Sequence, residues 1–254
     1  MFVLYQFKCM FVEISCSKIG FSSMVQNGEC QYPSTLVVMA AWNEQDGIGR
    51  TIAELEHYLD SPILVVDGKS RDKTVHVARS LGAAVIDQEG KGKGNAINCA
   101  LRHVNTDFDY IVLTDADYTY PAEFIPQMIK ILEENPGVGM VCGNRFNSHY
   151  HLKSMHNMLY FGNALIATAH NFLNGTQMRD PLTGLRVVRW KILKDWTPRS
   201  EGFDIEVELN HHVERQGYEI AEIPIFYRQR VGEKKLKPKH GFSIMKRILS
   251  EGMY

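Results

Sequence analysis

The sequence predicts an α/β fold in which helices cover both faces of a mostly parallel central sheet. From Leu36 onward, short runs rich in β-branched residues alternate with helical patterns, which is typical of successive βαβ units. The strand candidates are continuously apolar instead of alternating with polar residues. Such strands are buried on both faces, as they are in parallel sheets that lie between two layers of helices.

The first half of the chain alternates expected strands and helices in chain order. We expect strands at "TLVVMAAW", "ILVVD", "AAVID", "YIVLTD" and "VGMVCG", and helices over residues 46–59, 72–81, 95–103 and 121–134. The last of these helices begins at Pro121, because proline is tolerated in a first turn. The second half is less regular: a helical-looking "MLYFGNALIATAHNFL", a turn "RDPLTG", a strand "LRVVR", a helix near 203–216 and a strand "YEIAEIPIFY".

Length and composition bound the organisation of the chain. Its 254 residues, of which 44% are hydrophobic, suit one domain over 34–227, an N-terminal extension over 1–33 and a basic tail over 228–254. A formal net charge of -1 gives no bulk attraction to nucleic acid. The five cysteines are an odd number without CxxC spacing, which argues against a disulfide framework and a zinc site. No apolar run approaches the about 18 residues of a membrane-spanning helix.

Two carboxylates follow the expected strand "YIVLTD". Asp115 and Asp117, separated only by Ala116, lie on the loop where that strand ends. Ligands of parallel sheets bind at the carboxyl ends of the strands, and paired carboxylates can hold a hard divalent cation that also contacts a substrate's phosphates. We therefore expect Mg2+ or Mn2+ at this pair. A solvated loop is the alternative, because D-x-D sequences also arise by chance.

Two further strand ends carry side chains that suit a nucleotide. Asp67 ends "ILVVD", and its carboxylate can accept hydrogen bonds from a base or a ribose. In "AAWNEQDG", Trp42 offers a flat surface and Glu44 a hydrogen-bond acceptor, although an aromatic residue at such a place can serve packing alone. These strand ends and the D-x-D loop are expected to line one crevice.

The stretch "EGKGKGNAI" is rich in glycine and lysine but lacks the order of a P-loop. Gly90, Gly92 and Gly94 would allow the backbone to approach an anionic ligand closely, with Lys91 and Lys93 supplying charge. A mobile surface turn is the alternative.

Taken together, the segments resemble a known family. The ordered series is "AAWNE", "VVDGKSRDKT", "GKGKGNA", "TDADYTYP", "GNRF", "DPLTGLR", "GFDIEVEL" and "RVGEKKL". It resembles the family 2 glycosyltransferases with the GT-A fold, and among them the polyprenol-phosphate (dolichol-phosphate) sugar transferases. The resemblance covers about residues 35–236. It implies a hexosyltransferase that uses a nucleotide sugar donor, a polyprenyl phosphate acceptor and Mg2+ or Mn2+.

The resemblance also assigns roles by position. It implies that the nucleotide is bound by Ala40, Trp42, Glu44, Asp67, Lys93, Asp115 and Ala116, and the metal by Asp115 and Asp117. Phosphates would meet Arg145 of "GNRF", Lys235, and Arg230 or Arg228 of the tail. The implied catalytic set is Asp117, Asp180, Arg186 and Asp204, with Thr183 also shaping the sugar and acceptor side.

Departures from the family pattern bear on the donor. Ala40 replaces a proline, Trp42 a tyrosine, Gly68 a frequent second aspartate, and Thr119 a glutamine that is common in mannosyl enzymes; the tail motif is one residue short. "GFDIEVEL" looks more like the glucosyl branch, so Asp204 and Glu206 are expected to form hydrogen bonds with hydroxyls of a glucose-type sugar. The alternative is that both acids lie on an exposed helix face. UDP-glucose or UDP-GlcNAc is therefore favoured over GDP-mannose, which stays open.

A lipid phosphate acceptor fits a simple mechanism. Its oxygen is already anionic near neutral pH, so in-line attack with inversion needs orientation more than a general base. A soluble hydroxyl acceptor would instead need a base, for which Asp180, Asp204 or Glu206 could serve. A non-catalytic nucleotide-binding module is a further alternative. The first strand is followed neither by a nucleotidyltransferase motif nor by G-x-G-x-x-G.

The C-terminal tail concentrates positive charge. Between Tyr227 and Arg247 it holds eight Lys or Arg residues against the single acid Glu233. This composition suits phosphates and an anionic membrane surface, and "FSIMKRILSEGMY" can form a short amphipathic helix lying on lipid; a solvated tail is the alternative. We expect a cytoplasmic protein that is peripheral on the cytoplasmic face of a membrane, with a membrane subunit or a second copy of the chain as its partner.

Overall fold

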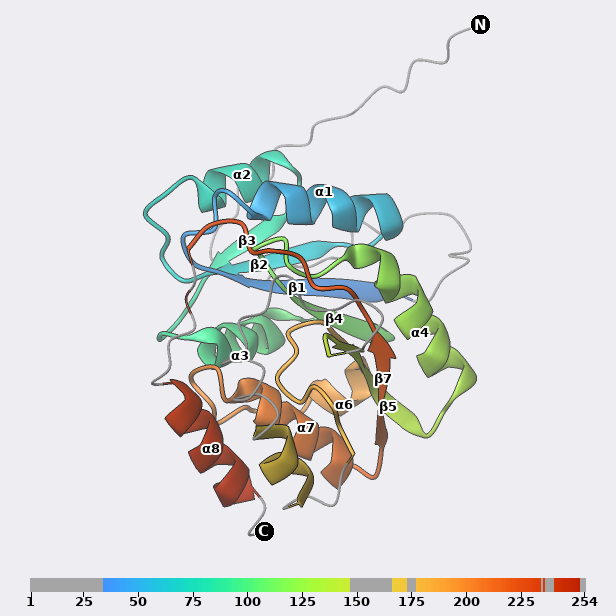
Figure 1. Ribbon diagram of the computed structural model, residues 1–254. Helices are drawn as coiled ribbons and strands as arrows, with labels where there is room; N and C mark the ends of the chain where they lie inside the picture. Colours follow the sequence, from blue (N-terminus) through green and yellow to red (C-terminus); the bar gives the residue numbers. More distant parts are fainter. Residues whose placement is uncertain (1–33, 147–165, 173–176, 234, 236–239, 252–254) are drawn as a thin grey trace, which may run out of the picture.

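The computed structural model describes residues 34–146, 166–172, 177–233, 235 and 240–251 (Figure 1). The expected extension over 1–33 lies outside the described residues. The same holds for the first part of the helix expected at "MLYFGNALIATAHNFL", of which residues 166–172 are described and helical.

Seven strands form one mixed, mostly parallel sheet in the order β3-β2-β1-β4-β6-β5-β7. Their bounds are β1 Thr35–Ala41, β2 Ile63–Asp67, β3 Ala84–Asp87, β4 Tyr110–Asp115, β5 Val138–Asn144, β6 Arg186–Arg189 and β7 Glu219–Pro224. β1 pairs in parallel with β2 and β4, and β7 with β5, whereas β6 runs antiparallel to β4 and β5. β1, β2 and β4 therefore end at the same edge.

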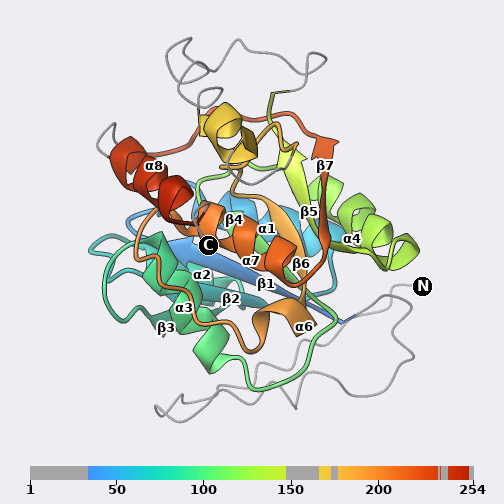
Figure 2. The same cartoon turned by 90° about the horizontal axis from the view of Figure 1, so that it is seen from below.

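Helices cover both faces of the sheet, as predicted (Figures 1 and 2). One face carries α1 Ile48–Tyr58, α2 Thr74–Ser80 and α4 Ile125–Glu134, and the other carries α3 Lys93–His103, α6 Trp190–Leu193 and α7 Ile205–Arg215. Successive β1 residues point to opposite faces: Val37 and Met39 join the core under α1, and Leu36 and Val38 join the core under α3 and α7. Burial on both sides explains why the strands are continuously apolar.

The helices of the first half begin at other residues than expected: α1 and α2 begin two residues late, at Ile48 and Thr74. Residues 122–124 form a 3₁₀ turn, and α4 begins only at Ile125, because Pro126 is tolerated in the first turn of an α-helix but not further inside. α3 begins at Lys93, two residues earlier than expected, directly after Gly92. The short α6 was not predicted.

The end of the chain forms a helix that is packed on the domain. Ile244 and Ile248 of α8, His240–Glu251, are buried in one cluster with Val207 of α7. The buried Glu251 carboxylate pairs with Arg199, Arg215 and Arg247. The predicted amphipathic helix is thus present with its apolar stripe against protein, leaving Phe242 and Leu249 exposed on its outer side. No helix among the described residues has the length and apolar character needed to cross a membrane.

Candidate active site

The loops after β1, β2 and β4 share an unusual backbone conformation. Each contains a non-glycine residue with positive φ: Asn43 (51°), Lys69 (62°) and Tyr118 (64°). Such residues are uncommon and persist only where the surroundings hold them. The first two loops are bonded together, since Asn43 N donates to Ser70 Oγ at 2.8 Å and Arg71 N donates to Asn43 Oδ1 at 2.8 Å. This edge of the sheet is therefore preorganised.

Asp115, at the end of β4, is paired with a lysine from the glycine-rich segment. Lys93 Nζ lies 2.6 Å from Asp115 Oδ1 and 2.8 Å from Glu206 Oε1 on α7. Burial alone would raise the pKa of Asp115, but the Lys93 ammonium outweighs it and holds that pKa below its ordinary value. Three segments that are distant in sequence meet in this one ion network.

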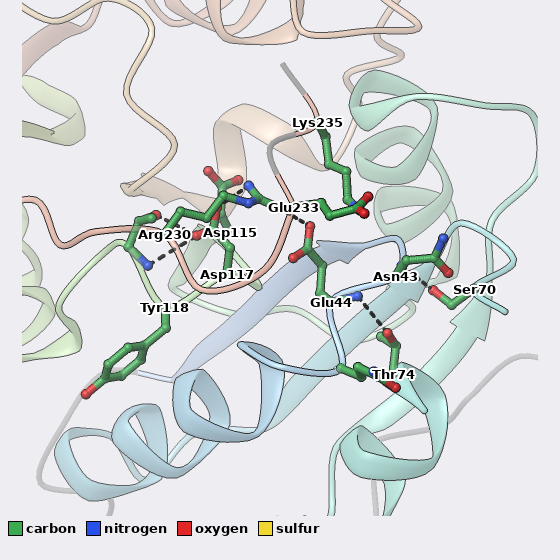
Figure 3. Close-up of polar contacts among 12 residues, drawn as sticks. Asn43, Glu44, Ser70, Thr74, Asp115, Asp117, Tyr118, Arg230, Glu233 and Lys235 are labelled. Carbon is green, nitrogen blue, oxygen red and sulfur yellow. Dashed lines mark hydrogen bonds and ion pairs between the residues drawn. The ribbon is translucent and has the colours of Figure 1, made fainter. Parts of the chain in front are cut away.

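Asp117 is paired with an arginine from the segment after β7. The Arg230 guanidinium reaches between Asp117 Oδ2 and Glu44 Oε1 and pairs with both (Figure 3). Thr119 Oγ1 also donates to Asp117 at 2.5 Å. Burial, followed by the nearby Asp115 charge, raises the pKa of Asp117, and burial raises the pKa of Glu44 to about 7 against the Arg230 charge.

We call residues 228–233 the strap, because they run across the end of β4. Arg228 N donates to Thr119 O at 3.0 Å and Val231 N to Asp117 O at 3.2 Å. Arg228 itself faces Glu54 of α1, with its Nη1 and Nη2 atoms at 2.5 and 2.8 Å from the carboxylate, and not Asp117. Of the two tail arginines named as alternatives for phosphate binding, Arg230 is therefore the one that pairs with a D-x-D carboxylate.

Glycines let these segments approach each other. A Cβ on Gly184 would lie 2.6 Å from Asp115 Oδ2, and one on Gly47 would lie 2.8 Å from the Asp117 Cα. In the glycine-rich segment, a Cβ on Gly94 would lie 2.0 Å from the Ser200 carbonyl oxygen, and one on Gly92 would lie 2.4 Å from the Glu201 carbonyl oxygen. Gly92 and Gly94 thus let the chain's own residues 200–202 approach closely, while Lys93 between the two glycines pairs with Asp115.

The loops expected to bind the nucleotide offer an exposed aromatic surface and a hydrogen-bond acceptor without a partner among the described residues. Trp42 is 52% exposed, and Lys235 Nζ lies 5.1 Å from the centre of its ring. Asp67 is buried; its Oδ2 accepts the Ser70 N–H at 2.8 Å, whereas its Oδ1 has no hydrogen-bond partner among the described residues. Buried polar atoms are normally paired, so this oxygen is available to a ligand. The backbones of Ala40, at the end of β1, and Ala116, between the carboxylates, complete this side.

Arg145 and Asp180 form a closed pair next to Asp115. Arg145 donates through Nε and Nη2 to the Asp180 carboxylate at 2.7 Å each, and through its backbone N–H at 3.1 Å. The Asp180 charge raises the pKa of Arg145 despite burial, so the guanidinium stays charged. The loop that carries Asp180 is held by Glu222 of β7, which accepts the backbone N–H groups of Arg179 and Asp180. The sequence analysis missed Glu222.

Two of the expected catalytic residues are engaged elsewhere. Arg186 is 1% exposed and donates to the Thr183 and Pro181 carbonyls and to Asn210, so it holds the "DPLTG" turn from inside the core. Asp204 lies at the start of α7 and pairs with Arg247 of α8 at 3.1 Å. Among the described contacts, none joins Asp204 to Asp115 or Asp117, whereas Glu206 reaches Asp115 through Lys93.

The oxygen ligands present suit a hard divalent cation that is bound partly by the protein and partly by a substrate. Among the described residues, no group of three or more His, Cys, Asp or Glu side chains could hold a metal ion. Asp115 and Asp117 are the pair that the sequence analysis expects to hold the ion, and they lie at and just after the end of β4. Mg2+ and similar ions are commonly held by one or two carboxylates together with substrate phosphates and water. The residues present fit that kind of site.

Comparison with known proteins finds one matching family and several similar proteins. The model of glycosyl transferase family 2 matches residues 36–197. A dolichyl-phosphate hexose transferase of Haloferax volcanii is 36% identical over 217 residues, which cover 84% of this chain and 91% of that protein. The glycosyltransferase AglJ of the same organism is 31% identical over 192 residues, or 75% of this chain and 62% of AglJ.

Solved structures show the same fold. Glucosyl-3-phosphoglycerate synthase from Mycobacterium tuberculosis, solved in complex with Mn2+, UDP and glucosyl-3-phosphoglycerate, superposes with a TM-score of 0.68 at 22% identity, over 87% of this chain and 80% of that one. The fold is therefore the GT-A fold implied by the sequence motifs. Because the family model covers most of the domain and relatives above 30% identity carry glycosyltransferase names, this chain belongs to glycosyl transferase family 2 and is a glycosyltransferase.

Proposed function

We propose that this glycosyltransferase moves a hexose from a UDP-sugar to a polyprenyl or dolichyl phosphate, with inversion at the anomeric carbon and with Mg2+ or Mn2+ at Asp115 and Asp117. The observation that carries the proposal is the edge formed by β1, β2 and β4. It presents an exposed Trp42, an unpaired Asp67 oxygen and the D-x-D pair within one preorganised set of loops.

The donor fits this edge by its chemistry. The uracil base would stack on Trp42, and Asp67 Oδ1 would accept a hydrogen bond from the base or the ribose. The diphosphate would lie toward Asp115 and Asp117, within reach of Lys235 and Arg230. UDP is favoured over GDP by the departures from the mannosyl pattern and by the UDP named in the Mycobacterium complex. GDP-mannose is the competing donor.

The cation, when bound, would neutralise the charge that develops on the leaving diphosphate. The chain's own residues orient the reactants. Lys93 and Glu206 fix the Asp115 carboxylate, and the Arg145–Asp180 pair supplies a buried positive group next to it. Glu206 keeps one carboxylate oxygen, Oε2, without a partner among the described residues, and this oxygen can accept a hydroxyl of the sugar.

The acceptor assignment follows the Haloferax relative named for dolichyl phosphate. An oxygen of the lipid phosphate attacks the anomeric carbon, and the bond from that carbon to the diphosphate oxygen breaks with its electrons on UDP. No proton has to be removed from the nucleophile, so the reaction needs no general base. The Arg145 guanidinium, held in place by Asp180, would help to orient an anionic acceptor.

Such an acceptor requires contact with a membrane, and the exposed apolar side chains fall in a suitable place. Phe242 on α8 is 80% exposed and Phe172, at the end of the helical residues 166–172, is 87% exposed; both helices pack on the same cluster with Val207 (Figure 2). We propose that this end of the molecule rests on the cytoplasmic face of a membrane. The basic tail contributes less than its composition suggests, because Arg228, Arg230 and Arg247 pair with carboxylates of the domain.

Thermal-shift titration tests the donor and the cation. UDP, GDP, UDP-glucose, UDP-GlcNAc and GDP-mannose are each added with and without Mn2+, to the native chain and to Asp117→Asn. We expect Mn2+-dependent stabilisation by the uridine nucleotides, lost in the variant, because a ligand that binds only the folded state raises Tm. Stabilisation by guanosine nucleotides alone would overturn the donor assignment, and stabilisation independent of both Mn2+ and Asp117 would overturn the metal site.

A further inference from the structure

Each D-x-D carboxylate is already paired with a basic side chain of the chain itself. Asp115 is paired with Lys93 and Asp117 with Arg230, and each base is shared with a second carboxylate, Glu206 or Glu44. The Arg230 pair is well shielded from water: the side chains of Asp117 and Glu44 are 4% and 7% exposed, and that of Arg230 is 24% exposed. Ion pairs in such surroundings are screened little by salt.

Arg230 occupies the place at which a cation would meet Asp117. Its guanidinium bonds the Oδ2 atom of Asp117 (Figure 3). The hydroxyl and the backbone N–H of Thr119 donate to the Oδ1 atom. A divalent ion that takes Oδ2 as a ligand must displace the guanidinium, because both are positive and compete for the same oxygen. Lys93, which also pairs with Glu206, is held more firmly than Arg230, because it is the first residue of the regular helix α3.

The strap can release Arg230 without unfolding. The backbone bonds that hold it are made by the flanking Arg228 and Val231, and Gly232 follows with a φ of +89°. The Arg230 Nε atom is buried without a partner among the described residues, so the side chain is not fully satisfied where it lies. Glu44 Oε2 is unpartnered as well. An anion that pairs better with Arg230 could therefore replace its contact with Asp117 and Glu44.

We propose that Arg230 stands in for the cation in the metal-free protein and moves to the diphosphate of the donor when the metal binds, so that metal and nucleotide bind cooperatively. The inference rests on the proposed function. A metal ion alone must break the Arg230–Asp117 pair and leaves the displaced guanidinium beside another cation. A metal ion that arrives with UDP supplies the diphosphate as a new partner for Arg230. By linkage, UDP and the metal each strengthen the binding of the other by the same factor.

The test is a titration with Mn2+, followed by the electron paramagnetic resonance signal of the free ion, with and without saturating UDP. In the native chain, we expect UDP to tighten Mn2+ binding at least about tenfold. Arg230→Gln keeps hydrogen-bond donors but removes the charge. It should bind Mn2+ alone about tenfold more tightly than the native chain, and it should gain less from UDP.

Two variants serve as controls. Arg228→Gln makes the same change on the same strap, but at the residue that faces Glu54, and should bind Mn2+ as the native chain does. Asp117→Asn should lose the site. If the native chain binds Mn2+ with UDP but Arg230→Gln binds Mn2+ alone no more tightly, the stand-in role of Arg230 is wrong and the metal site survives. If the native chain binds no Mn2+ even with UDP, the proposed metal site fails, and this inference fails with it.

Discussion

Replacing Ile248 by alanine measures how firmly α8 is built into the domain. Ile248 is fully buried against α7, and the substitution removes three carbon atoms. At about 0.8 kcal/mol for each buried carbon, the lost burial amounts to about 2.4 kcal/mol. A residual cavity raises the expected cost to about 3 kcal/mol. Leu249→Ala, at the next residue of the same helix, removes the same number of carbons from a side chain that is 50% exposed, and should cost about 1 kcal/mol.

Urea unfolding at pH 7, followed by circular dichroism, compares the two variants. We expect Ile248→Ala to lower the free energy of unfolding by about 2 kcal/mol more than Leu249→Ala does. Equal costs would mean that α8 does not rest on α7 in solution, and would remove the support that Arg247 of α8 gives to Asp204.

Three further predictions follow from the packing and the charges. His170 is buried, and burial together with His211 lowers its pKa to about 4 from 6.5. Below pH 6.5 the unfolded chain therefore binds a proton at His170 that the folded chain does not bind. In urea unfolding, His170→Gln should reduce the loss of stability between pH 7 and pH 5 by about 2 kcal/mol. An unchanged loss would show that His170 is not the group responsible. Gly94→Ala places a Cβ 2.0 Å from the Ser200 oxygen and should lower the free energy of unfolding by about 3 kcal/mol. Gly137→Ala has open space around it and should lower that free energy far less. Similar Tm values for the two variants would refute the close approach of Gly94 to Ser200. Trp42→Ala should leave Tm nearly unchanged and weaken UDP binding about tenfold by calorimetry, and full affinity would exclude stacking on this ring.

The sequence predicted the sheet because burial leaves a local trace. Continuous apolar runs such as "ILVVD", bounded by turn residues, favour strands that are covered on both faces, and the strand ends then place Trp42, Asp67 and Asp115 at one edge. Helix boundaries were less certain, since Pro126 delays α4 and Gly92 allows α3 to begin early. Hydrophobic patterns that repeat every few residues therefore predicted which strands and helices exist, but not the residue at which each helix begins.

The partners of the charged residues could not be predicted in this way. Arg230 and Glu44 are 186 residues apart, and Arg228 and Glu54 are 174 apart, so their pairing leaves no local pattern. Arg186 has the same sequence context whether it meets a ligand or, as here, the Thr183 carbonyl inside the core. Two glycines of "GKGKG", Gly92 and Gly94, lie directly against residues 200–202, a contact that the sequence analysis did not predict. Tertiary packing decides each of these cases.

Transfer of labelled sugar to lipid tests the central claim most directly. The native chain and Asp117→Asn are incubated with UDP-[14C]glucose, Mn2+ and dolichyl phosphate in detergent, and the label is followed into the organic phase, with parallel reactions that contain 3-phosphoglycerate or no acceptor. We predict organic-soluble label that requires both dolichyl phosphate and Asp117. Label that leaves UDP-glucose only when 3-phosphoglycerate is present, and stays in water, would contradict the lipid acceptor and establish a soluble one.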